Sequence, residues 1–139
     1  MIAFKDGQTT TGALIMADAD IVWNIITDTH LWPQWGPSVS VIECADRFIN
    51  ATSRGRLQTS LGVWLPFTIT AFEDIHFWSW RIGAIEATGH RVRKEGDHQC
   101  ILTFSMPWWS TPYIVVCNRA LRHIKKMAES YPPPDMQQQ

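Results

Sequence analysis

The stretch ADADIVWNIITDTHLWPQWGP (residues 17–37) decides the fold, because it combines a helical pattern, aromatic bulk and a sharp break. Apolar residues recur at i, i+3, i+4 and i+7: Ala19, Val22, Trp23 and Ile26. This spacing predicts one buried face of a short helix. Asp28 or Thr29 can cap a second helical turn, which ends by Gly36–Pro37. We therefore expect a compact helical corner that carries Trp32 and Trp35 and leads into a strand.

The chain on both sides of this corner is predicted to form a sheet. Threonines and aliphatic residues indicate one strand over residues 9–16, before the corner. Six more strands are predicted over residues 39–45, 53–60, 63–73, 77–85, 87–94 and 99–106. Apolar and polar side chains alternate in several of them, as where Trp78 and Trp80 flank Ser79. Such one-sided strands favour an antiparallel sheet with one buried face.

A long amphipathic helix is predicted over residues 112–129. Its apolar stripe has helical spacing and contains Tyr113, Val116, Cys117, Ala120, Leu121, Ile124, Met127 and Ala128. The opposite face is polar and basic. Eighteen residues at a rise of about 1.5 Å each give a helix of about 27 Å, the breadth of a small sheet.

Composition limits the possible class of protein. The chain has 139 residues and a net charge of -1, so we expect one domain over residues 1–131 and no nucleic-acid binding. The Pro- and Gln-rich residues 132–139 are predicted to be a disordered tail. The first ten residues lack the apolar run of a signal peptide, which favours a cytoplasmic protein. The oligomeric state is left open.

No membrane span, metal or cofactor is expected either. Residues 98–118 lack charged side chains other than histidine, but Pro107 and Pro112 interrupt this stretch, so a strand, a loop and a helix start explain it better than a spanning helix. The three cysteines form no CxxC motif, and the histidines form no HxxxH or HExxH pair. Nucleophile motifs such as GxSxG and glycine-rich phosphate loops are missing as well.

The order of these elements, strand, two short helices, six strands and a long helix, resembles the START-like (SRPBCC) superfamily, and in particular its polyketide cyclase/dehydrase-like members. The resemblance covers roughly residues 8–130. It rests on Val22-Trp23, Asp28 and Trp32-Pro33-Gln34-Trp35, supported by Trp78-Ser79-Trp80 and Gly89-His90-Arg91.

This resemblance implies an α+β helix-grip fold, in which a curved seven-stranded antiparallel sheet wraps around the C-terminal helix. It also implies a cavity between sheet and helix for a lipid, a polyketide or another apolar molecule. It implies no single reaction, since members of the superfamily include carriers, sensors and cyclases.

The chain has eight tryptophans, and four of them are among the candidate ligand-binding residues, which are Trp78, Trp80, His90, Trp108, Trp109, Tyr113, Cys117 and Leu121. Buried tryptophans such as Trp78 and Trp80 can simply fill the core, or they can line an incompletely filled cavity. Trp108 and Trp109 lie in the loop before the last helix. The resemblance places this loop near a cavity entrance.

His90 is the candidate catalytic residue. It shares a strand face with Thr88 and Val92, so it is predicted to point inward if Val92 does. An inward imidazole can orient a ligand or transfer a proton. The alternative is a core histidine whose ring is hydrogen-bonded to a neighbouring hydroxyl. Tyr113 and Glu86 are possible helpers, although surface charge explains Glu86 better than a role at the cavity rim.

Three functions follow from these observations. The first is binding of a small hydrophobic molecule in an internal cavity. The second is an enzyme of the cyclase or dehydratase type that uses His90 as acid or base. The third is an interaction module without a ligand. A large internal cavity would favour the first two functions over the third. A buried carboxylate beside His90 would favour the enzyme, and a filled core with an exposed apolar patch would favour the interaction module.

Overall fold

The computed structural model describes residues 2–131, which form eight strands and three α-helices. The strands are β1 (Ile2–Lys5), β2 (Gln8–Ile15), β3 (Val39–Cys44), β4 (Arg54–Thr59), β5 (Trp64–Glu73), β6 (Phe77–Ile82), β7 (Ile85–Gly96) and β8 (Gln99–Pro107). The helices are α1 (Ala19–Thr27), α2 (Trp32–Trp35) and α3 (Ile114–Glu129). Two 3-10 helices, η1 (Thr29–Leu31) and η2 (Trp108–Tyr113), precede α2 and α3. The predicted tail lies outside the described residues.

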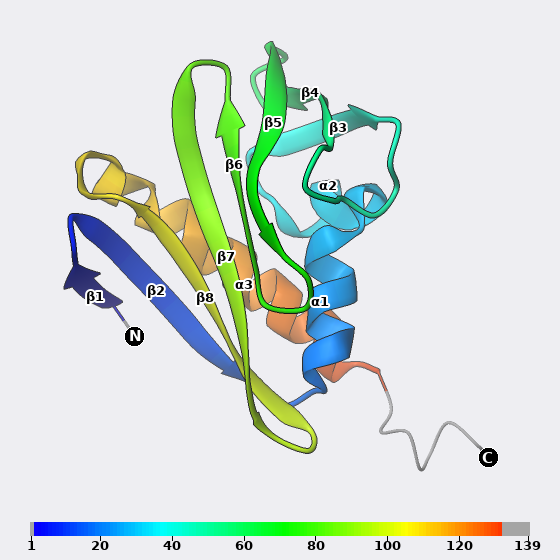
Figure 1. Cartoon of the computed structure of the whole chain (residues 1–139), viewed down its shortest axis with the longest axis vertical. Helices are drawn as coiled ribbons and strands as arrows, with labels where there is room; N and C mark the ends of the chain where they lie inside the picture. Colours follow the sequence, from blue (N-terminus) through cyan, green and yellow to red (C-terminus); the bar gives the residue numbers. More distant parts are fainter. Residues whose placement is uncertain (1, 132–139) are drawn as a thin grey trace.

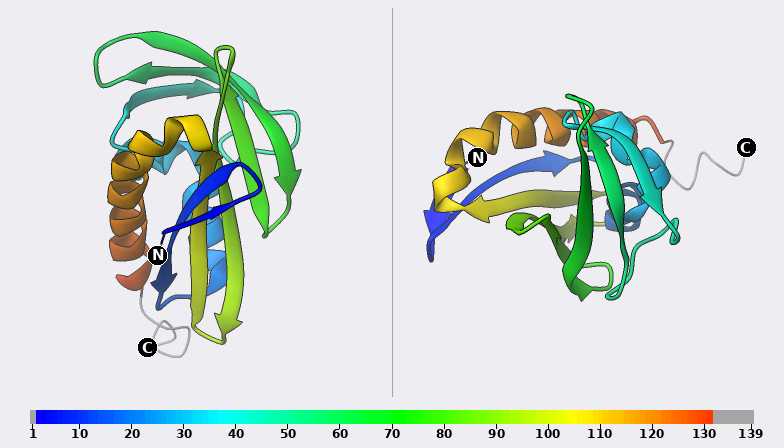
Figure 2. Two further views of the ribbon diagram at one scale, coloured as in Figure 1. Left: turned by 90° about the vertical axis from the view of Figure 1, so that its left-hand side faces the viewer. Right: turned by 90° about the horizontal axis from the view of Figure 1, so that it is seen from above.

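The eight strands form one antiparallel sheet in the order β1-β2-β8-β7-β6-β5-β4-β3. The sheet is strongly curved, and the helices lie on one side of it (Figures 1 and 2). Along α3 the buried side chains are those of the apolar stripe, from Cys117 to Ala128. The predicted α+β helix-grip fold is therefore confirmed.

The sheet has one strand more than the seven that the sequence pattern predicts. All four residues of β1 are exposed, so this strand lacks the alternation of buried and exposed side chains that reveals a strand. It pairs with β2 through a two-residue turn, Asp6–Gly7, in which both residues have positive φ. An Asp-Gly pair is a strong signal for a tight hairpin, so the turn itself is the feature of the sequence that indicates β1.

The last helix also begins later than predicted. Residues 108–113, including Pro112, form η2, and α3 starts at Ile114 instead of residue 112. Non-helical dihedral angles at Ser110 bend η2, which separates this segment from the regular helix. As a result Tyr113 stands at the junction of η2 and α3 and is 41% exposed, so it does not belong to the buried stripe.

An aromatic cluster fills the centre of the core. Trp32 from the helical corner stacks on Trp78 of β6, with ring centroids 5.3 Å apart, and meets Trp80 edge-on at 5.1 Å. The ring of Phe67, on the neighbouring strand β5, contacts both Trp32 and Trp80. Large aromatic side chains bury much apolar area, so this cluster fixes the corner to the sheet.

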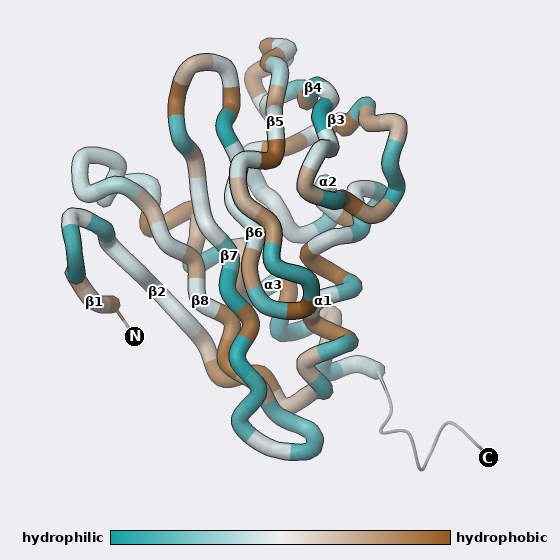
Figure 3. Tube along the Cα trace, viewed as in Figure 1, coloured by the Kyte–Doolittle hydropathy of each residue, from teal (hydrophilic) through white to brown (hydrophobic). Residues whose placement is uncertain are grey.

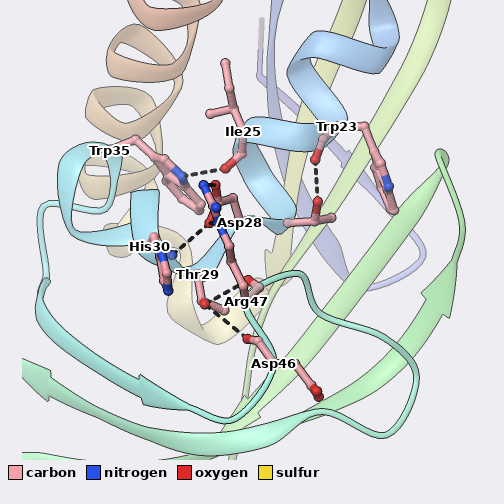
Figure 4. A network of polar contacts seen from close by, with 9 residues as sticks. Trp23, Ile25, Asp28, Thr29, His30, Trp35, Asp46 and Arg47 are labelled. Carbon is pink, nitrogen blue, oxygen red and sulfur yellow. Dashed lines mark hydrogen bonds and ion pairs between the residues drawn. The ribbon is translucent and has the colours of Figure 1, made fainter.

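A buried carboxylate joins the helical corner to the loop between β3 and β4 (Figure 4). Asp28 caps η1 by accepting the His30 backbone N–H at 3.0 Å, which decides between the two predicted capping residues. Its two oxygens also accept hydrogen bonds from Nε and Nη2 of Arg47 at 3.2 and 3.1 Å. The Thr29 hydroxyl donates to the carbonyl groups of Asp46 and Arg47 in the same loop.

We expect Asp28→Ala to lower the free energy of unfolding by about 1–2 kcal/mol, the upper part of the range for loss of a capping side chain. Chemical denaturation measures this change. Glu43→Ala is the control, because it removes another carboxylate–arginine contact, with Arg56, in which both side chains are more than half exposed. Exposed ion pairs contribute little, so Glu43→Ala should leave stability almost unchanged. Equal losses would show that burial of Asp28 is unimportant.

The two ends of the sheet differ in polarity. The hairpin that joins β7 to β8 is hydrophilic (Figure 3). At the other end of β8, η2 exposes Trp108 and Trp109, which are 67% and 53% accessible. Tyr113 and Val115 are exposed on the same segment of the chain. An exposed aromatic surface therefore lies beside the start of α3.

Candidate functional site

A small cavity lies between the sheet and the first half of α3, beside the connection from α2 to β3. Its volume is about 40 Å³. The helical corner contributes Trp35, the sheet contributes Trp80, His90 and Phe104, and α3 contributes Cys117. Of the described residues that line it, none is Asp, Glu, Lys or Arg. The cavity is therefore predominantly apolar and aromatic.

A β-bulge between β6 and β7 sets the geometry of the cavity floor, which is the part of the lining formed by Trp80, Thr88 and His90 of the sheet. Ser79 pairs with Gly89 and Arg81 with Glu86, so Trp80 alone faces two residues of β7. Bulges of this kind redirect side chains. Here both Trp80 and Thr88 point to the buried face, and Thr88 lies next to His90 on that face.

These floor residues form a hydrogen-bond chain whose direction is fixed by its ends. His90 Nδ1 lies 3.2 Å from the Trp78 carbonyl oxygen, which can only accept, so Nδ1 carries the proton. Nε2 of the neutral ring then accepts from the Thr88 hydroxyl at 2.9 Å. The Thr88 oxygen in turn accepts the Nε1–H of Trp80 at 3.1 Å. The tautomer of His90 is thus assigned by its partners.

Burial keeps the His90 imidazole uncharged. The side chain is 1% exposed, and burial lowers its pKa from 6.5 to about 3, although the bond to the Trp78 carbonyl opposes this shift. The ring stacks on Trp78 at 3.9 Å and meets Phe104 edge-on at 4.6 Å. No carboxylate of the described residues is hydrogen-bonded to it.

The tryptophans of the helical corner also use their ring N–H groups inside the protein. Trp32 Nε1 donates to the Ile26 carbonyl at 2.9 Å, and Trp35 Nε1 donates to the Ile25 carbonyl at 3.3 Å. These carbonyl groups lie in α1, so each bond holds an indole ring against the preceding helix (Figure 4 shows that of Trp35). The rings present carbon surfaces to the cavity.

Two hydroxyl groups meet where the cavity reaches the surface. Ser38 Oγ, in the connection from α2 to β3, lies 2.7 Å from the Tyr113 hydroxyl at the start of α3. Burial raises the pKa of Tyr113, while its bond to Ser38 opposes the rise. The phenol is therefore neutral at physiological pH. We call this Ser38–Tyr113 contact the entrance contact.

Cys117 places a thiol in the same cavity. Burial raises its pKa to about 12, so the thiol is protonated near neutral pH. The thiolate, and not the thiol, is the nucleophile in cysteine chemistry. Cys117 consequently behaves as a small apolar wall residue.

The structure brings together four of the eight residues that the sequence suggested for ligand binding: Trp80, His90, Tyr113 and Cys117 line the cavity. Trp78 lies behind His90 in the core, and Leu121 lines a separate hollow between α3 and β2. Trp108 and Trp109 are exposed on η2 and do not line the cavity. Glu86 lies at a hollow lined by Ser79, Gly89 and Ser105, and does not line the cavity that His90 faces.

Among the lining residues that lie outside the sequence-predicted set, Thr88 and Ser38 are the two that carry hydroxyl groups. Thr88 shares a strand face with His90, and this parity is the signal in the sequence that indicates a cavity residue. Ser38 follows the Gly36–Pro37 break that was predicted from the sequence. No pattern in the sequence indicated that the turn after this break approaches the start of α3.

The curved antiparallel sheet, the long helix against it and the apolar cavity between them define a helix-grip protein of the SRPBCC, or Bet v 1-like, class. The chain belongs to the family described as polyketide cyclase / dehydrase and lipid transport, whose model matches residues 7–138. This membership supports a ligand-binding or cyclase role and leaves ligand and reaction undefined. None of the curated proteins compared with the chain matches it.

Several solved structures share the fold at low sequence identity. The Zhui aromatase/cyclase from Streptomyces sp. R1128 has 12% identity and a TM-score of 0.69, over 88% of this chain and 93% of that chain. Norcoclaurine synthase from Thalictrum flavum, in complex with dopamine and hydroxybenzaldehyde, has 12% identity and a TM-score of 0.65, over 95% and 90%. A protein of unknown function from Enterococcus faecalis has 18% identity and a TM-score of 0.68, over 94% and 77%.

Residues 2–131 contain neither a membrane-spanning helix nor a cluster of metal ligands. No helix in this range combines the length and apolar character that crossing a membrane requires. The His, Cys, Asp and Glu side chains of the same range form no group of three or more that could hold a metal ion.

Proposed function

We propose that this protein binds a small, uncharged and largely apolar molecule in the cavity between the sheet and α3. The observation that carries the proposal is the lining itself. Aromatic and aliphatic side chains surround the cavity, and no charged side chain of the described residues faces it. Ligand sites of this kind are typically apolar, with a few polar groups that fix orientation.

The ligand must widen the cavity on binding. A volume of about 40 Å³ holds only a few water molecules, whereas an apolar cavity that binds benzene has a volume of about 150 Å³. The entrance contact is the natural place for this change, because a single hydroxyl pair joins two segments there. Separation of Ser38 and Tyr113 exposes the apolar walls behind them, and we propose it as the route of entrance.

The enzyme alternative has less support. Both ring nitrogens of His90 are hydrogen-bonded within the protein, and a pKa of about 3 makes the imidazole a weak base near neutral pH. The carboxylate that would favour acid–base chemistry is not among the described residues that line the cavity. The hydrogen bond from the Thr88 hydroxyl to Nε2 instead supports the alternative in which His90 is a hydrogen-bonded core histidine.

The interaction module remains a second candidate, because Trp108 and Trp109 are exposed on η2. Exposed apolar surface favours contact with a partner. The two functions are separable, since neither tryptophan lines the cavity. The double variant with Trp108→Ser and Trp109→Ser tests this separation. If it still binds the ligand, the cavity and the exposed tryptophans have different roles.

A fluorescence titration with N-phenyl-1-naphthylamine, a neutral apolar dye, tests the cavity. We expect saturable binding at micromolar concentration. Val116→Phe fills the wall of the cavity from α3 and should weaken binding by about fivefold or more, because overpacking of a filled site costs about 1 kcal/mol or more.

Val115→Phe is the matched control for this variant. Val115 is the preceding residue of the same helix, and its side chain is mainly exposed and does not line the cavity. The same chemical change there should leave the affinity for the dye unchanged. Equal losses in the two variants, or the absence of saturable binding by the wild-type protein, would contradict a ligand site in this cavity.

A further inference from the structure

The hydrogen-bond donors of the cavity floor are all used within the protein. The Nε1–H of Trp80 donates a hydrogen bond to Thr88, and the Nδ1–H of His90 donates one to the Trp78 carbonyl. Trp32 and Trp35 give their ring N–H groups to carbonyl groups of α1. A polar atom of a ligand that reaches the floor therefore meets no unused N–H group on these four rings.

An acceptor, in contrast, remains available there. A threonine hydroxyl has one proton and two lone pairs. The Thr88 proton is given to His90 Nε2, and one lone pair accepts the Nε1–H of Trp80. No other described residue donates to this oxygen, and Thr88 lines the cavity. The second lone pair can thus accept a hydrogen bond from a ligand.

One buried donor without a partner lies nearby but outside the cavity. Among the described residues, Trp78 Nε1 is buried and has no hydrogen-bond acceptor. The Trp78 ring stacks against Trp32 on one side and His90 on another, and it does not line the cavity. A ligand reaches this N–H only if those rings move, so it does not alter the pattern of the floor.

On the basis of the proposed function, we infer that the ligand carries an N–H or O–H donor at its inner end and that the Thr88 oxygen accepts its hydrogen bond. Phenols, alcohols and N–H heterocycles have this chemistry. A ligand that points a bare carbonyl or ether oxygen inward leaves that oxygen without a strong donor, which is unfavourable in a buried site.

The inference also excludes anionic groups from the floor. A carboxylate at this position would lose its hydration with no cationic side chain in the described lining to replace it. Polar groups at the outer end of the ligand meet different surroundings, because Ser38 and Tyr113 both carry hydroxyls at the entrance contact. Only the inner end is restricted to donors.

Indole and benzofuran provide a direct test, because they have nearly the same shape and differ in an N–H against an oxygen. Isothermal titration calorimetry on the full chain measures both affinities. One neutral hydrogen bond is worth about 0.5–1.5 kcal/mol, so indole should bind about 2- to 12-fold more tightly than benzofuran.

Two substitutions at one position show whether Thr88 causes this preference. Thr88→Ser keeps the hydroxyl and should keep the preference for indole. Thr88→Val has a similar shape but removes the Thr88 oxygen, which frees the Nε1–H of Trp80 as a donor and His90 Nε2 as an acceptor. Benzofuran then gains a donor that the wild-type floor does not offer it, so the preference for indole should decrease. Circular dichroism and thermal unfolding check that each variant is folded. If Thr88→Val does not fold, the wild-type and Thr88→Ser ratios still decide.

The outcomes separate this inference from the proposed function. Tighter binding of indole by the wild-type protein and by Thr88→Ser supports the inference. Equal affinities, or tighter binding of benzofuran, overturn it and leave the cavity as a ligand site with a different polar pattern. Failure of both compounds to give a saturable heat overturns the inference together with the proposed function.

Discussion

Trp35→Ala should lower the free energy of unfolding by about 3–5 kcal/mol, the range for removal of a large buried aromatic side chain. Trp35 is 5% exposed and lies at the end of the helical corner. Its ring packs edge-on against His90 and Phe104, and its N–H is bonded to the Ile25 carbonyl. Truncation leaves a void beside an existing cavity and an unpaired carbonyl in α1. Chemical denaturation measures the loss, which is large enough to prevent folding of a marginally stable domain.

Trp109→Ala provides the comparison with equal loss of side-chain volume. Trp109 is exposed on η2, where its removal creates no enclosed void. Surface substitutions usually change stability by about 0.5 kcal/mol or less. Similar costs for the two variants would show that the division between the buried corner and the exposed segment is wrong.

Acidification should destabilise the protein through His90. The unfolded chain binds a proton at this ring near pH 6.5, whereas the folded protein does so only near pH 3. Between these values the unfolded state holds the extra proton, so stability falls as pH falls. The contribution of His90 is present above pH 6.5. By pH 5 it should have decreased by about 2 kcal/mol relative to pH 7, and it continues to decrease down to about pH 3.

His90→Phe isolates this effect because phenylalanine does not titrate. The variant loses two hydrogen bonds, but this cost is the same at every pH. Other acid-sensitive contacts, such as that of Glu129 with Lys125, are common to both proteins. The difference in unfolding free energy between wild type and variant, measured by denaturation from pH 7 to pH 4, should therefore change by the His90 contribution alone. A constant difference would mean that His90 is not neutral and buried in the folded state.

Much of the fold could be predicted because side-chain burial follows the backbone period. In β8 the residues Cys100, Leu102, Phe104 and Met106 are all buried, as their alternation with Thr103 and Ser105 indicates. The inward direction of His90 followed from the same parity with Val92. The exception is β1, where no face is buried and the period carries no information.

The site was less predictable because its properties depend on partners far apart in the sequence. The entrance contact joins Ser38 to Tyr113 across 75 positions, and no local pattern encodes it. The role of His90 depends on the bulge that brings Thr88 beside Trp80. Strand parity identified which side chains point inward, but not which of their polar atoms are already bonded.

The position of β2 in the sheet has a consequence for how the chain folds. β2 lies between β1 and β8, so Gln8 pairs with Pro107 and Ile15 with Cys100. On the ribosome, which adds about 5–20 residues per second, this pairing must wait until almost the whole domain has been synthesised. Contacts between distant segments also slow folding, because loop closure precedes the gain from pairing. The tryptophan-rich corner that follows β2 therefore emerges long before the sheet can bury it, and its apolar side chains stay exposed during synthesis.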